Sequence, residues 1–406
     1  MKRDDALTFV LATGAFTTML HGSMLSPLLK DISADFNVSD ASVGQLATLY
    51  SALAAVIAFA VVPLMDRYSR RAMLRFECGM LLVGTLLSAL APSYIWLTIG
   101  RGLDGIGGAF IFGVCMAAAG DLFANPVERN RRIGIIASAA SVAIIAGQPL
   151  LTQISAYFGW RWAVAATLVP PLVALLGTRW LPSDALQHDE GSLWSAYRAR
   201  YRQVMTNRET VWLLVVFIGM LSVWSAFSVY LGAYLETELS ASPNATSLIF
   251  LVSGICFTTG SLFVPRVIER VPKRRVHATF ATLMGVNLLG AGIVYTNIPT
   301  MALFVGITSL LGVSLYLITG ILLLDSLPEA RGAVMALQAA GTEVGLAFGA
   351  AWGGAALVVS NDNYVAVYQS LAILIPLVII CLLMSARSAR PQPTTADGEL
   401  AINPSA

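Results

Sequence analysis

Four ionisable side chains stand inside long apolar stretches of this sequence: His21, Arg101, Asp104 and Glu343. Ionisable groups in such stretches are costly to bury, and by default they mark proton or substrate pathways. Carboxyl groups can bind and release protons, an imidazole titrates near neutral pH, and a guanidinium keeps its charge. Counting residues from the expected helix ends places all four at similar depth. We therefore expect them to meet in one layer.

Arg101 and Asp104 are three residues apart, on one helix face together with Gly105 and Gly108. This spacing predicts a local ion pair beside a close helix contact. One interpretation gives the pair a direct role in coupling; the other is that it neutralises itself and only tethers neighbouring helices. For His21 and Glu343, the alternative to proton coupling or substrate contact is a structural hydrogen bond.

Further polar and aromatic side chains stand at central positions of the apolar stretches. Their mixture suits an amphiphilic organic solute better than an inorganic ion, because we find no cage of carboxylates or carbonyls. The predicted substrate-binding residues are His21, Gln45, Arg101, Gln148, Gln153, Trp224, Ser225, Tyr316, Gln338 and Glu343.

The composition shows what kind of chain carries these groups. Of 406 residues, 57% are hydrophobic and 12% are charged, against about 25% charged in ordinary soluble domains. A membrane span needs about 20 apolar residues. The sequence predicts an all-α integral membrane protein with twelve spans, near 8–29, 42–65, 72–92, 94–120, 133–158, 162–181, 211–235, 243–265, 276–296, 299–324, 333–359 and 364–385.

The loops predict the organisation and the orientation. Residues 182–210 form a long loop between an N-terminal bundle, 1–181, and a C-terminal bundle, 211–386, and the Pro-rich tail 387–406 should be disordered. Lys and Arg gather in alternate loops, and the other set of loops holds Lys30 and Arg161 alone. The excess of positive charge predicts that both termini and the long loop are cytoplasmic. The compact loops favour a bacterial protein, and we expect it in the inner membrane.

The two halves repeat each other. "DRYSRR" (66–71) aligns with "ERVPKRR" (269–275), and Asp121 aligns with Asp325 at the same shift along the chain. Both members of each pair follow the corresponding span of their half. Parallel repeats of this kind predict two pseudo-symmetric six-helix bundles.

Three motifs carry a family resemblance: "PLMDRYSRR" (63–71), "RGLDGIGGA" (101–109) and "FGWRW" (158–162). Over its twelve spans the chain resembles the major facilitator superfamily, closest in pattern to the bacterial drug and metabolite proton antiporters. Their fifth-helix motif is kept in part in "AGQPLLTQ" (146–153), where Thr152 and Gln153 stand near the expected glycines.

The resemblance implies roles for particular residues. Arg101 would tune a nearby proton carrier, either Asp104 or His21. Asp66 would help to latch the halves on the cytoplasmic side, with Arg70 and Asp121 as partners. The implied conformational switch comprises Asp66, Arg67, Arg70, Asp121, Glu269, Arg270 and Asp325.

These observations predict a secondary transporter that exports a small amphiphilic drug or metabolite by proton-coupled alternating access. Asp104 and Glu343 are the leading proton sites, tuned by Arg101, with His21 secondary. The alternatives are uptake or facilitated export of an anionic metabolite held by Arg101, and a transport-inactive sensor or scaffold. The expected partners are the small-molecule solute, protons and the lipid bilayer. We expect a monomer that binds no cofactor, metal ion or nucleic acid. The sequence contains no nucleophile, metal-ligand or phosphate-loop pattern that would indicate an enzyme.

Overall fold

The computed structural model describes residues 3–61, 68–123, 125–182 and 201–389. These residues form helices and short connections, and their one β contact is an isolated bridge between Ala291 and Tyr295. Two predicted switch residues, Asp66 and Arg67, lie outside the described residues. So do positions 183–200 of the predicted interdomain loop and 390–406 of the predicted tail.

Helices of the N-terminal half begin at polar caps or prolines in several cases; the Ser69 hydroxyl, for example, accepts from the amide of Ala72 at 3.2 Å. The elements in order are α1 (Arg3–Ser23), η1 (Ser26–Leu28), α2 (Leu29–Phe36), α3 (Asp40–Val61), α4 (Arg70–Ala89), α5 (Tyr94–Gly108), α6 (Ile111–Leu122), α7 (Pro126–Val142), the π-helix η3 (Ala143–Gly147), α8 (Gln148–Phe158), α9 (Trp160–Ala166), α10 (Val169–Gly177) and η4 (Thr178–Trp180).

Helices of the C-terminal half are longer and less interrupted. Asn207 and Asn297 cap the first and the fourth long helices of this half. The elements are α12 (Arg208–Leu239), α13 (Pro243–Ile268), α14 (Lys273–Leu289), α15 (Ile298–Ser326), η5 (Pro328–Ala330), α16 (Arg331–Val359), α17 (Tyr364–Leu371) and α18 (Leu374–Ser388).

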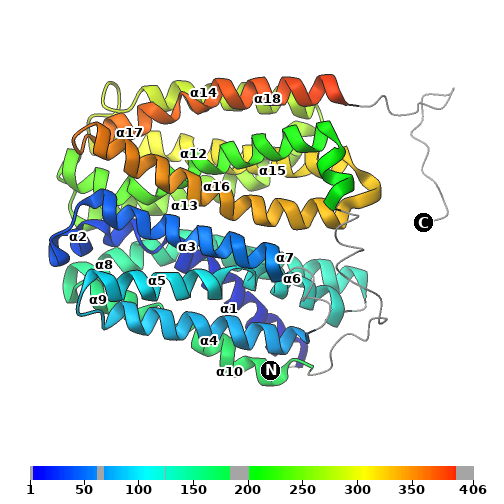
Figure 1. The fold of residues 1–406 in the computed structure, drawn as a ribbon, viewed down its shortest axis with the longest axis horizontal. Helices are drawn as coiled ribbons and strands as arrows, with labels where there is room; N and C mark the ends of the chain where they lie inside the picture. The colour runs from blue at the N-terminus through cyan, green and yellow to red at the C-terminus, as the bar shows by residue number, and fades with distance from the viewer. Residues whose placement is uncertain (1–2, 62–67, 124, 183–200, 390–406) are drawn as a thin grey trace.

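The helices run roughly side by side along the long axis, with the N-terminal half on the lower side of Figure 1 and the C-terminal half on the upper side. At the boundary, α3 of the first half packs along α16 of the second. Ten segments of the described chain are long and apolar enough to cross a membrane. The other two predicted spans correspond to α1 and to α14, whose 17 residues are slightly fewer than the about 20 that a straight span requires.

Several predicted spans are interrupted where the sequence weakens a helix. The 94–120 span breaks between α5 and α6 at Ala109–Phe110, directly after two glycines. The 133–158 span passes through the π-helix η3, two residues before Pro149. Proline has no amide hydrogen to donate to the preceding turn, and local π segments in membrane helices help to satisfy the backbone groups that proline leaves free.

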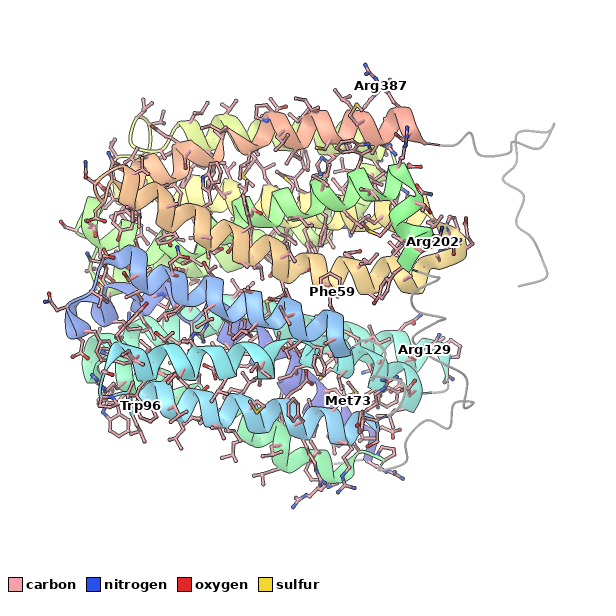
Figure 2. All side chains as sticks on the ribbon, in the orientation of Figure 1. Phe59, Met73, Trp96, Arg129, Arg202 and Arg387 are labelled. Carbon is pink, nitrogen blue, oxygen red and sulfur yellow. The ribbon has the colours of Figure 1, made fainter. Side chains whose placement is uncertain are left out.

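The two ends of the bundle differ in charge. Arg129, Arg202 and Arg387 lie at one end, whereas Trp96 lies at the other; both ends can be followed in Figure 2. We call the first the basic end (Arg70, Arg129, Arg202, Lys273 and Arg387) and the second the opposite end. This asymmetry is the three-dimensional form of the loop pattern in the sequence.

The halves are joined at the opposite end. The Gln153 amide of α8 donates to Ser247 Oγ at 2.8 Å and to Asn244 Oδ1 at 3.1 Å on α13. The Tyr364 hydroxyl of α17 donates to the Asp40 carboxylate at the start of α3. In the described residues, the hydrogen bonds between halves lie between this end and mid-depth, so this conformation is closed at the opposite end.

Candidate functional site

A buried chain of hydrogen bonds links α1, α4 and α5 near mid-depth. His21 Nε2 lies 3.1 Å from Thr85 Oγ1, and Thr85 Oγ1 lies 3.0 Å from Asp104 Oδ1. The other ring nitrogen of His21 lies 3.0 Å from the carbonyl oxygen of Thr17, one turn earlier on α1. None of these side chains is accessible to solvent. The structure therefore connects an imidazole to a carboxyl group through one hydroxyl.

Arg101 completes this cluster. Its Nη1 donates to Asp104 Oδ2 at 3.3 Å and its Nη2 to the His21 carbonyl oxygen at 3.4 Å. The guanidinium lies over the Tyr50 ring of α3, 4.8 Å from the centroid, an arrangement that favours a cation. The pair expected from the three-residue spacing is thus formed, with side-chain exposures of 1% and 0%.

Two glycines allow this density of polar groups. A Cβ atom at Gly84 of α4 would lie 2.6 Å from Asp104 Oδ1 and 2.6 Å from the Gly100 carbonyl oxygen. A Cβ atom at Gly108 of α5 would overlap the hydroxyl of Tyr50. Residues without side chains at these positions let α3, α4 and α5 approach closely enough to exclude water.

Glu343 reaches the same region from the other half. It stands on α16, and its carboxyl group lies beside the Ser51 hydroxyl of α3. Its Oε2 is buried and has no hydrogen-bond partner. The neighbouring residue, Tyr50, lies within electrostatic range of Glu343, Arg101 and Asp104. Arg101, Asp104 and Glu343 therefore lie around one short stretch of α3, and His21 joins them through Thr85 and Arg101.

Three polar residues predicted to bind substrate lie between this cluster and the opposite end. The Gln148 amide donates to the Ser23 carbonyl oxygen at 3.4 Å, and the Ser225 hydroxyl donates to the Leu346 carbonyl oxygen at 2.6 Å. Gln45 abuts Gly354 across the boundary between the halves. Ser225 is thus occupied within its own half in this conformation.

The other central candidates belong to the C-terminal half. The Trp224 ring packs against Phe257 at 5.5 Å, and the Tyr316 ring packs against Phe217 at 5.3 Å. Gln338 of α16 is buried and its Oε1 has no hydrogen-bond partner. Gln153, by contrast, lies at the opposite end in the contact with α13, away from the central cluster.

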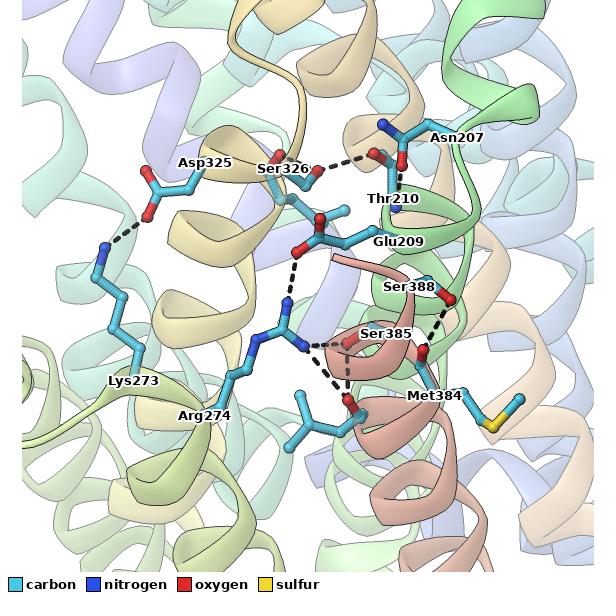
Figure 3. A network of polar contacts seen from close by, with 12 residues as sticks. Asn207, Glu209, Thr210, Lys273, Arg274, Asp325, Ser326, Met384, Ser385 and Ser388 are labelled. Atoms are coloured by element: carbon cyan, nitrogen blue, oxygen red, sulfur yellow. Dashed lines mark hydrogen bonds and ion pairs between the residues drawn. The ribbon is translucent and has the colours of Figure 1, made fainter. Parts of the chain in front are cut away.

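The basic end holds the same ion pair in each half. Arg70 Nε lies 3.0 Å from Asp121 Oδ2, and Lys273 Nζ lies 2.5 Å from Asp325 Oδ2. Figure 3 shows the second pair beside Arg274, which contacts Glu209 at 2.5 Å. The aligned positions of the sequence repeat thus adopt matching contacts.

Two further switch residues show no such pairing in the described chain. Glu269 and Arg270 lie between α13 and α14, are exposed, and line an open pocket at the basic end with Lys273 and Arg274.

Several residues in or near the buried cluster were not predicted from the sequence. Tyr50, Ser51 and Thr85 are uncharged, so no charge-based pattern singles them out. Glu77 of α4 is buried, and its Oε1 accepts from the Phe110 amide at the break between α5 and α6, at 3.1 Å. It carried a usable signal, an acid inside a predicted span.

His277 is a second missed ionisable group, buried in α14 with Nε2 2.9 Å from Thr319 Oγ1. It stands inside the predicted span 276–296, so the rule that singled out His21 applies to it too. Among the described residues, no group of three or more His, Cys, Asp or Glu side chains could hold a metal ion.

Comparison with known families agrees with this architecture. The family profile described as "Major Facilitator Superfamily" matches residues 11–239 and 213–404. The chain belongs to the Major Facilitator Superfamily. The family predicted from the motifs and the all-α fold predicted from the apolar stretches are thereby confirmed. This superfamily member is a multi-pass membrane transporter of a small molecule.

Individual relatives are distant. The chain is 26% identical over 273 residues to "Uncharacterized MFS-type transporter YwfA" of Bacillus subtilis (strain 168), covering 66% of this chain and 65% of that protein. It is 28% identical over 357 residues to a "Probable sugar efflux transporter" of Helicobacter acinonychis (strain Sheeba), covering 85% and 86%. Among solved structures, a D-xylose-proton symporter superposes with a TM-score of 0.74 at 14% identity, over 96% of this chain and 98% of that one.

Proposed function

We propose that this superfamily member is a proton-coupled exporter of a small organic solute. In this proposal the bundle of residues 1–181 rocks against the bundle of residues 211–386, and the 182–210 loop connects them. The observation that carries the proposal is the buried cluster of His21, Arg101 and Asp104, which meets Glu343 of the other half at Tyr50 and Ser51.

Proton binding at Asp104 would change how the helices hold together. A charged carboxylate at Asp104 neutralises Arg101, whereas a protonated one leaves the guanidinium without a counter-ion. An unpaired buried charge is costly, so the contacts of Arg101 with Tyr50 of α3 and with α1 should rearrange. Because α3 packs along α16, a change at Asp104 reaches the boundary between the halves.

Glu343 would act on the same boundary from the C-terminal half. Its carboxyl lies beside Ser51, the neighbour of Tyr50, so protonation there alters the other side of the α3–α16 contact. Two proton sites that bias one interface from opposite sides give the differential interaction that a conformational change requires. We assign Asp104 and Glu343 as the leading sites, with His21 secondary.

The substrate class is proposed from unpartnered acceptors and from the names of relatives. Gln338 Oε1 and Glu343 Oε2 are buried on α16 without partners, and buried polar atoms are usually satisfied. A solute with hydroxyl donors would satisfy both. Two relatives bear the name "Probable sugar efflux transporter". We therefore propose hydroxylated metabolites of sugar-like polarity as the first substrate class and amphiphilic drugs as the second.

An anionic metabolite held by Arg101 has less support. The guanidinium is paired with Asp104 and 1% exposed, so an anion would have to displace a buried carboxylate. We also propose that the basic end faces the cytoplasm of a bacterial cell, with the chain in the inner membrane as a monomer, since basic loops are retained inside.

The proposal is tested in proteoliposomes with an imposed pH gradient and a panel of radiolabelled pentoses, hexoses and amphiphilic dyes. Asp104→Asn and Glu343→Gln should each abolish gradient-driven flux and leave exchange of solute for solute. The control is Glu238→Gln, which changes an exposed carboxyl near the opposite end. Gradient-driven flux that survives in both variants, or wild-type flux that ignores the gradient, would refute the coupling.

A further inference from the structure

The hydrogen bonds around Thr85 determine how many protons the cluster can hold. The Thr17 carbonyl oxygen can only accept, so the His21 nitrogen beside it, Nδ1, must carry a proton. The remaining atoms in line are His21 Nε2, Thr85 Oγ1 and an oxygen of Asp104. A hydroxyl has one proton to donate, so Thr85 cannot donate to both neighbours at once.

Two arrangements satisfy both bonds of Thr85. In the first, a protonated Asp104 donates to Thr85, and Thr85 donates to Nε2 of a neutral His21. In the second, an imidazolium at His21 donates to Thr85, and Thr85 donates to the Asp104 carboxylate. The two arrangements contain the same number of protons and differ by one concerted shift along the line.

Asp104 has no other described group with which to trade a proton. Its remaining polar contact is Arg101, which stays protonated in proteins. On the α4 side Gly84 lies so close that a Cβ atom there would be 2.6 Å from Asp104 Oδ1. His21, by comparison, is followed by Gly22, which is exposed and has no atom within 4 Å of a Cβ position.

We propose that Thr85 is a proton relay through which Asp104 and His21 share one proton. In the forward step the Asp104 O–H bond breaks and its proton passes to Thr85 Oγ1, while the hydroxyl proton of Thr85 passes to His21 Nε2. The reverse step restores the first arrangement. The proposal rests on the proton coupling proposed above and names its route.

The relay explains the setting of Arg101. In the imidazolium arrangement Arg101 pairs with a charged Asp104, and in the neutral arrangement it pairs with a protonated one. The charged or titratable groups around the line are Arg101 of α5, Tyr50 of α3 and, beyond Tyr50, Glu343 of α16 and Glu77 of α4. One shift of the proton therefore changes the charge of the carboxyl group paired with Arg101, the cation that lies over Tyr50.

The test follows the Asp104 carboxyl by infrared spectroscopy of the full chain in lipid, with deuterium oxide as the probe. The Asp104 band is identified as the protonated carboxyl band that Asp104→Asn lacks. Thr85→Val removes the hydroxyl and keeps the shape, and we expect the exchange of this proton for deuterium to slow by at least about tenfold. Thr85→Ser keeps a hydroxyl and should exchange within about threefold of wild type.

Thr152→Val is the matched control, because Thr152 is also buried and bonds within its own helix, to the Gln148 carbonyl oxygen at 3.0 Å. His21→Gln removes the imidazole and should slow the exchange as much as Thr85→Val does. This variant replaces Thr85→Val in the test if the valine variant does not fold. Wild-type exchange in Thr85→Val or His21→Gln would overturn the relay, as would the lack of any protonated Asp104 band.

The vesicle experiment is independent of this measurement. Wild-type flux that ignores the pH gradient together with slowed exchange in Thr85→Val would refute proton coupling and keep the relay. Gradient-driven flux with unchanged exchange would refute the relay alone.

Discussion

Replacing Gly254 with alanine should weaken the closure of the opposite end, because α13 meets η3 near mid-depth, below that end, without room for a methyl group. A Cβ atom at Gly254 would lie 2.7 Å from Ile145 Cα and 2.9 Å from its backbone nitrogen. Ordinary contacts to such an atom are 3.4–4 Å long. Two of the three nearest atoms belong to the backbone of Ile145 and cannot rotate away, so the two helices must separate.

The size of the effect follows from the overlap. The backbones must move apart by about 0.7 Å or more, and inserting a methyl group into a packed contact costs about 1–3 kcal/mol. A conformation without this contact does not incur the cost. The ratio of closed to open populations at the opposite end should therefore fall by about 5- to 140-fold.

Spin-label distances measure this population. In a background without the four native cysteines, labels at Tyr157 and Val359, both exposed near the opposite end, should report longer distances in Gly254→Ala. Gly134→Ala is the matched control in the segment that contains Ile145, since a Cβ atom there meets nothing within 4 Å. Both glycine-to-alanine changes increase helix propensity equally. An unchanged distance distribution in Gly254→Ala, or an equal shift of the distances in both variants, would refute the packing argument.

Three further outcomes can be measured by thermal unfolding in detergent or by transport. Arg101→Ala should lower the free energy of unfolding by about 3–5 kcal/mol, because it leaves Asp104 buried without a cation, and replacing both by apolar residues should recover most of this loss; a double variant no better than the single one would contradict it. Asp325→Asn breaks a half-exposed ion pair and should cost at most about 1 kcal/mol while slowing transport; unchanged turnover would show that this pair does not control switching. Glu77→Leu should cost about 1–3 kcal/mol by leaving the Phe110 amide unsatisfied, whereas Glu77→Gln keeps an acceptor; equal losses would contradict the capping role.

Charge patterns predicted a large part of this molecule. The arginine of a buried pair is so costly inside a membrane that its presence in an apolar span marks a site, and the structure places Arg101 with Asp104 at 3.3 Å. The same holds for the repeat, since charged residues at matching loop positions form matching pairs. Both predictions depend on residue type and spacing along single helices.

The rest depends on which helices meet, and spacing along a helix does not encode that. Thr85 belongs to the site because Gly84 beside it lets α5 approach, and Tyr50 belongs because Gly108 makes room for its hydroxyl. Gln153 lies in the contact with Ser247 of α13, although its place in the motif suggested a central position. Short-range patterns carry no information on such partners from other helices.

The two halves share contacts at the basic end and differ at mid-depth, and this difference bears on mechanism. Each half has its Arg or Lys to Asp pair, as duplicated moving parts would. The buried acid–base line of His21, Thr85 and Asp104 lies wholly in the N-terminal half, and the C-terminal half contributes Glu343 to the region around α3. In the proposed mechanism, protons bound on the two sides of α3 therefore act on the same α3–α16 contact. The proposal therefore predicts that this one interface couples proton binding in both halves to their relative motion, and that the ion pairs at the basic end carry no proton.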